Sequence, residues 1–119
     1  MANYSAYLPH ELEQISAQNL SLAEITQTNC PVCHNQTIRI YIHDLDHSRT
    51  KSAEWIWCHV CRKYAHHRVG LLPMKYQYSD PLTDERFNDN LCLTGDKWYE
   101  FLNSLYDRGV LPQTISKRK

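Results

Sequence analysis

Glycine is scarce in this chain, with only three residues among 119. A loop that cradles phosphates needs several glycines close together, so the sequence argues against a nucleotide site of that kind. Long apolar runs are also missing, and the N-terminal stretch MANYSAYLPHELEQ has neither a basic start nor an apolar segment. We therefore expect a cytoplasmic protein with no membrane partner.

A basic excess is missing as well, because thirteen Lys and Arg balance thirteen Asp and Glu. Dedicated nucleic-acid binders usually carry such an excess. The charges are nevertheless unevenly spread, since residues 49–75 carry six bases and one acid, and residues 80–107 carry seven acids and two bases. This pattern fits either self-complementary packing or two distinct binding faces.

What the chain does contain is enough apolar material for a folded domain. Hydrophobic residues make up 42% of the sequence and aromatic residues 11%. This composition is typical of folded rather than disordered chains, and the length is that of a single domain. We therefore treat residues 1–119 as one domain.

The cysteine spacing carries the strongest chemical signal. Cys30 and Cys33 are separated by two residues, and Cys58 and Cys61 repeat that spacing after an interval of 24 residues. Each short spacing lets a tight turn direct two sulfurs at one point, and two such turns complete a closed tetrahedral site. We predict a structural zinc ion at these four residues, with iron as the alternative. Four thiolates leave no open coordination position, so the site predicts no catalysis.

Strand patterns surround the cysteines. TIRIYIH alternates apolar and polar residues from Thr37, as a half-buried strand does. The aromatic and β-branched stretches EWIWC and RKYAHHRV predict two more strands. We expect a three-stranded antiparallel sheet, with the polar stretch DLDHSRTKS as a hairpin loop.

Helical patterns flank this predicted sheet. Leu8, Leu12 and Ile15 recur at helical spacing, which predicts an N-terminal helical segment within the first 28 residues. A C-terminal amphipathic helix is predicted at about residues 96–108. Residues 70–93 are expected to be mostly loop with one turn near Asp84, and the tail 113–119 is expected to be disordered. The predicted fold class is therefore α+β. The apolar face of the C-terminal helix consists of Trp98, Phe101, Leu102, Leu105 and Tyr106.

The cysteine pairs and strands together resemble a zinc ribbon, in which two zinc knuckles lie at the ends of a small antiparallel sheet. The resemblance covers about residues 28–69. Many knuckles place Gly after the second cysteine, at a position that favours positive φ. His34 and Arg62 occupy those positions here, which leaves the turn geometry open.

Other candidate chemistry is weaker. Residues 43–47 read HDLDH, a cluster that a hydrolytic metal site could use, but the strand and turn pattern favours a solvated loop. His66 and His67 have no neighbouring carboxylate or nucleophile, so an acid–base role is not favoured. Cys92 is expected to be a small core residue. The sequence therefore predicts a protein that is not an enzyme.

Nucleic acid is one possible partner. Three basic side chains could contact phosphates, and three nearby aromatic rings could stack on nucleobases. The alternative for the two tryptophans is packing against the flanking helices, which we favour. The basic side chains are those of Arg62, Lys63 and Arg68, and the rings are those of Trp55, Trp57 and Tyr64.

A protein partner is the hypothesis we favour. Four acids could meet a basic surface: Asp80, Asp84, Glu85 and Asp89. The run WIWCHVCRKYAHHR, followed by a proline-containing loop and a helix of the type WYEFLNSLYDRGVLP, is similar to small bacterial zinc-ribbon proteins encoded as immunity proteins beside toxins. This resemblance implies a non-enzymatic protein that neutralises a toxin by direct binding. The alternative is a nucleic-acid-binding ribbon that acts as a transcription or RNA-associated factor.

Overall fold

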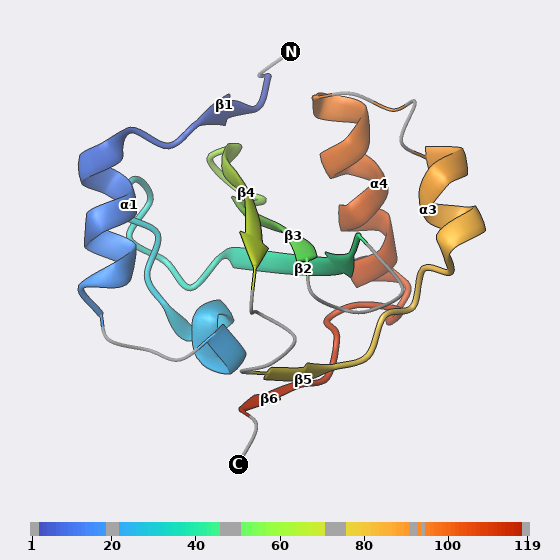
Figure 1. Ribbon diagram of the computed structural model, residues 1–119. Helices are drawn as coiled ribbons and strands as arrows, with labels where there is room; N and C mark the ends of the chain where they lie inside the picture. Colours follow the sequence, from blue (N-terminus) through green and yellow to red (C-terminus); the bar gives the residue numbers. More distant parts are fainter. Residues whose placement is uncertain are drawn as a thin grey trace.

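Three antiparallel strands form the centre of the molecule: β2 (Ile38–Asp44), β3 (Lys51–Cys58) and β4 (Lys63–Gly70). Figure 1 shows the computed structural model, which describes residues 3–18, 22–45, 51–70, 76–90, 93 and 95–117. Helices lie on both sides of the sheet (Figure 1). The predicted α+β class is confirmed.

The sheet is mixed, so the prediction of a purely antiparallel three-stranded sheet is wrong. A fourth strand, β1 (Ser5–Ala6), pairs in parallel with β4 and gives the order β1-β4-β3-β2. The Ser5 N–H donates to the Arg62 carbonyl at 3.0 Å, and the Tyr7 N–H donates to the Tyr64 carbonyl at 2.8 Å. The outer edge of β4 offers unpaired backbone groups, and the N-terminal segment satisfies them.

Each face of the sheet has its own core because side chains alternate along a strand. On one face, Trp55 and Trp57 pack against α4 (Asp96–Asp107), where Leu102 and Leu105 are fully buried. This confirms that the tryptophans pack against a flanking helix. On the other face, isoleucines of β2 and β3 pack with Ile15 of α1 (Pro9–Ser16) and Ile25 of the 3-10 helix η1 (Leu22–Gln27).

The C-terminal helix ends close to the predicted boundary. Gly109 follows with a φ of 77°, a left-handed conformation that ends helices and favours glycine. The Tyr106 hydroxyl accepts from the Ile40 N–H at 3.0 Å and donates to the Ile40 carbonyl at 2.8 Å. These bonds attach α4 to the middle of β2.

The predictions of a loop at 70–93 and of a disordered tail need correction. The first region contains β5 (Tyr76–Tyr78) and α3 (Asp84–Asn90), and β5 pairs with a C-terminal strand, β6 (Ile115–Lys117). Gln113 orders the tail, because its buried side chain accepts from the Ile42 N–H and donates to the Ile42 and Ser79 carbonyls. Residues 118 and 119 lie outside the described residues.

Candidate metal centre

The four predicted cysteines meet at one end of the sheet, with all four sulfurs within 4.8 Å of one another. The Cys30 and Cys61 sulfurs are 3.4 Å apart, and the Cys33 and Cys58 sulfurs are 3.7 Å apart. A disulfide would bring two sulfurs to about 2.05 Å, so the four residues are free thiols. Cys30 and Cys58 are buried, whereas Cys33 and Cys61 are partly exposed.

This donor set fits a tetrahedral metal ion. Zinc–sulfur bonds of about 2.3 Å in a regular tetrahedron place the sulfurs about 3.8 Å apart. The two measured separations, 3.4 Å and 3.7 Å, lie close to that value. The cluster can therefore hold a metal ion such as zinc, with every coordination position filled by sulfur.

The turns that present the cysteines have matching backbone geometry. The residue after each second cysteine has positive φ, 64° at His34 and 59° at Arg62. The His34 N–H donates to the Cys30 carbonyl at 2.7 Å, and the Arg62 N–H donates to the Cys58 carbonyl at 3.0 Å. Both turns thus adopt the left-handed conformation for which many zinc knuckles use glycine, despite the side chains present.

Two hydroxyl groups support the sulfurs and were not predicted from the sequence. The Thr37 hydroxyl lies 2.9 Å from the Cys58 sulfur and 3.1 Å from the Cys33 sulfur. The buried Tyr7 hydroxyl lies 3.0 Å from the Cys30 sulfur. Hydroxyls that donate to thiolates orient metal ligands. Thr37 is the first residue of a predicted strand, and Tyr7 is 23 residues from its partner, so neither position carries a signal for a metal-supporting hydroxyl.

The pKa values of the thiols indicate that a cation would favour ionisation of all four cysteines. Burial raises the pKa of Cys33, but hydrogen bonds from Thr37, the Asn35 backbone and neighbouring thiols bring that pKa down to about 7. Burial raises the pKa of Cys61, and the hydrogen bonds and charges of Cys58 and Cys30 raise it further. The four sulfurs therefore cannot all ionise alone, whereas a coordinated cation deprotonates them.

The solvated-loop prediction for the HDLDH cluster is wrong for His43. This side chain is 4% exposed on β2, and its ring stacks on Phe87 with the centroids 3.7 Å apart. Its Nδ1 lies 2.5 Å from an Asp80 carboxylate oxygen, and the Tyr41 hydroxyl donates to the other oxygen at 2.9 Å. This arrangement attaches α3 and its preceding loop to the sheet. Asp46 and His47, like Cys92, lie outside the described residues.

The four acids predicted to bind a partner lie in different environments in the structure. Asp80 is directed toward the sheet, where its carboxylate also accepts the Leu82 N–H at 3.0 Å. Glu85 and Asp89 are exposed on α3, and the side chain of Asp84 lies outside the described residues. An acidic surface made by Glu85 and Asp89 therefore remains on α3, with the exposed Arg86 between them in the sequence, while Asp80 has a structural role.

The residues predicted to bind nucleic acid also differ in their exposure to solvent. Arg68 is exposed, but Arg62 and Lys63 are half-buried beside the second cysteine turn. Trp57 is fully buried and Trp55 is 6% exposed, so neither ring is available to stack on a base. Tyr64 is half-buried like Arg62 and Lys63, so the basic side chains and this one ring of the predicted interface remain partly accessible.

Comparison with known proteins adds no family assignment. No family model, curated protein or solved structure matches this chain. Within the described residues, no helix is both long and apolar enough to cross a membrane.

Proposed function

We propose that this chain is a zinc-stabilised protein-binding module of the zinc-ribbon type. Its partner is a bacterial toxin domain, which it neutralises in the cytoplasm by direct binding, as an immunity protein does. The protein performs no chemistry of its own. Its zinc ion is structural and is held by Cys30, Cys33, Cys58 and Cys61.

The closed sulfur cluster is the observation that carries this proposal. All four ligand atoms lie within 4.8 Å of one another, so a tetrahedral ion there has no position for water or substrate. In small domains such an ion contributes on the order of 10–16 kcal/mol of apparent binding free energy to folding. A small fold that uses four cysteines for a structural metal ion is more typical of a binding scaffold than of a catalyst.

The acidic surface of α3 supports a basic protein partner. Glu85 and Asp89 are exposed, while Phe87 of the same helix is buried against the sheet. The contacts of Asp80 with Tyr41 and His43 fix the chain just before the helix. Acidic groups on a fixed helix lose little entropy on binding and accelerate association with a basic surface. The toxin assignment within this proposal rests on the sequence resemblance to immunity proteins.

A nucleic-acid-binding ribbon is less well supported. Sequence-tolerant binding to single strands relies on exposed aromatic rings, and Trp55 and Trp57 are covered. Because its net charge is zero, the chain as a whole also has no electrostatic attraction to the phosphate backbone, on which such binding depends.

A pull-down with the tagged full chain tests the proposal. Lysate from the native host is divided, one half is treated with nuclease, and the recovered proteins are identified by mass spectrometry. We expect one stoichiometric protein in both halves, and we expect its expression alone to be toxic to cells. Recovery of nucleic acid, or of proteins that disappear after nuclease treatment, would instead establish the nucleic-acid alternative.

Charge reversal then tests the surface. Glu85→Lys is expected to slow association with the recovered protein, with a difference that shrinks as salt is added. Glu100→Lys makes the same change at an exposed position of α4 and serves as the matched control. Equal association rates for the two variants would exclude α3 as the contact surface.

A further inference from the structure

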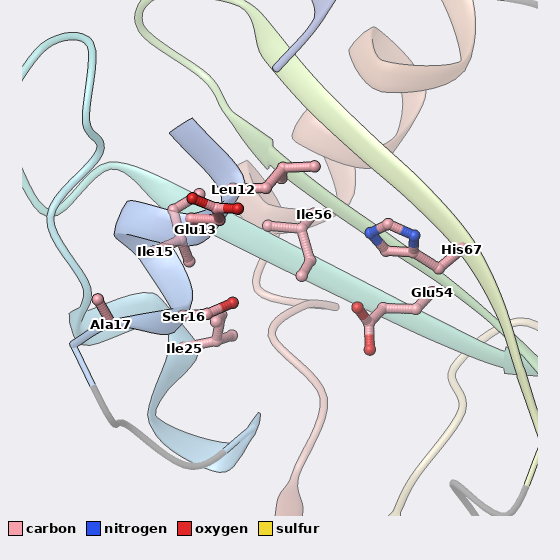
Figure 2. Close-up of a pocket in the computed structure, with 9 residues that line it drawn as sticks. All are labelled: Leu12, Glu13, Ile15, Ser16, Ala17, Ile25, Glu54, Ile56 and His67. Atoms are coloured by element: carbon pink, nitrogen blue, oxygen red, sulfur yellow. The ribbon is translucent and has the colours of Figure 1, made fainter. Parts of the chain in front are cut away.

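A groove lies on the side of the sheet opposite α4, between the helical segments α1 and η1 and the strands β3 and β4 (Figure 2). Its volume is about 760 Å³, which is within the range of small-ligand sites. Four apolar side chains form much of its wall: Leu12, Ile15, Ile25 and Ile56. The groove is separate from the four-cysteine centre, whose sulfurs do not line it.

A buried carboxyl group is directed into this groove. Glu54 is 9% exposed, and Figure 2 shows its carboxylate extending from the sheet toward the side formed by α1 and η1. Within the described residues this carboxylate makes no hydrogen bond or ion pair, and its electrostatic partner is His67 on the paired strand. Buried carboxylates normally have hydrogen-bond or ion-pair partners, because an uncompensated buried charge is costly.

The surroundings of Glu54 favour a positively charged ligand. Burial raises the pKa of Glu54, while the charge of His67, its cross-strand neighbour, lowers that pKa by a smaller amount. Among the described residues that line the groove there is no Lys or Arg, and Glu13 adds a second carboxylate on α1. A cation would therefore replace the solvent that the Glu54 carboxylate loses on burial.

We infer that this groove binds the ammonium group of a primary amine with an apolar stem, with Glu54 as its counter-ion. The four apolar side chains surround the stem, and the ammonium donates to the Glu54 carboxylate. A free alkylamine and a lysine side chain of another protein share this chemistry, because both place an ammonium on a short carbon chain. The inference does not depend on the toxin proposal, because a different surface is involved.

Titrations monitored by nuclear magnetic resonance test this inference on the metal-loaded full chain at neutral pH. The probes are n-hexylamine, n-hexanol and hexanoate, which have the same stem and differ in the charge of the head group. We expect hexylamine to shift the backbone amides of groove residues and to bind about tenfold more tightly than hexanol, because a charge-assisted hydrogen bond is added. Hexanoate is expected to bind more weakly still.

A matched pair of variants assigns the charge preference. Glu54→Gln keeps the shape and removes the charge, so it is expected to bring hexylamine down to the affinity of hexanol. Glu100→Gln makes the same change on exposed α4 and is expected to leave hexylamine binding unchanged. The three-probe comparison on the unmodified chain provides the test should Glu54→Gln fail to fold.

The source of the amine is distinguished by a short lysine peptide and its norleucine counterpart. Binding of the lysine peptide alone would identify a protein side chain, and binding of hexylamine alone would identify a free amine; either supports the inference. Equal affinities for hexylamine and hexanol, tighter binding of hexanoate, or unchanged hexylamine binding by Glu54→Gln would overturn it.

Discussion

Replacement of Thr37 by valine tests whether the hydroxyl beside the sulfurs supports a metal ion. Valine keeps the β-branched shape that suits the start of a strand, and it removes only the polar group. The hydroxyl lies 2.9 Å and 3.1 Å from the sulfurs of Cys58 and Cys33. When these sulfurs are thiolates the hydroxyl acts as the donor, so its loss removes one hydrogen bond from a thiolate, while the backbone N–H groups of Cys61 and Asn35 remain as donors to Cys58 and Cys33.

The expected magnitude follows from the number of protons available. Loss of a group that supports metal ligands typically lowers metal affinity by about 10- to 100-fold. A hydroxyl has one proton and can donate to only one of its two neighbouring sulfurs at a time. We therefore expect the lower end of this range, about tenfold, which corresponds to about 1.4 kcal/mol.

Competition with a coloured zinc chelator measures this change under reducing conditions. Thr114→Val is the matched control, because Thr114 is exposed in the C-terminal segment, away from the sulfurs. We expect Thr37→Val to lose zinc at about one tenth of the chelator concentration that the unmodified chain needs. A zinc affinity within twofold of the unmodified chain, or an equal loss in Thr114→Val, would refute the supporting role of the hydroxyl.

Three further predictions concern the hydroxyl of Tyr7, the core and the groove. Tyr7→Phe removes the contact to the Cys30 sulfur and is expected to weaken zinc binding by up to about tenfold in the same competition assay. Leu102→Ala, at a fully buried position of α4, is expected to lower the free energy of unfolding of the metal-loaded chain by about 2–5 kcal/mol in urea; a loss below 1 kcal/mol would contradict the packing described. Because burial raises the pKa of Glu54, the folded chain holds this proton to higher pH than the unfolded chain does. Its stability relative to Glu54→Gln should therefore fall as pH rises from about 4 through the raised pKa, and a constant difference would be inconsistent with a buried carboxyl.

The features predicted correctly from the sequence depend on local pattern. The two cysteine spacings were sufficient to predict that Cys30, Cys33, Cys58 and Cys61 meet, because each tight turn fixes the direction of two sulfurs. Alternating apolar residues predicted β2, aromatic and β-branched residues predicted β3 and β4, and helical periodicity predicted α4 to within one residue at its end. In each case the determining residues lie close together in the chain.

The features that were missed depend on contacts between distant residues. His43 is buried through its contact with Asp80, which is 37 residues away in the sequence. Gln113 orders the tail through hydrogen bonds to Ile42, which is 71 residues away. The two residues of β1 form a strand only because the edge of β4 is available. No pattern within these short segments encodes such pairings.

The Glu54 groove was missed for a related reason. The alternation of β3 places Glu54 on the same face as Ile56, and an acid on an apolar face ordinarily indicates exposure. Only the packing of α1 and η1 over that face makes the carboxyl buried.

Elemental analysis of the protein purified under reducing conditions tests the central claim most directly. The four-cysteine centre predicts one zinc ion per chain, loss of that ion in Cys33→Ser, and loss of folded structure when a strong chelator removes the metal. One iron ion per chain would keep the metal centre and change only its metal. A chain that is folded without metal, and whose circular dichroism and melting temperature do not change when chelator is added, would contradict the account.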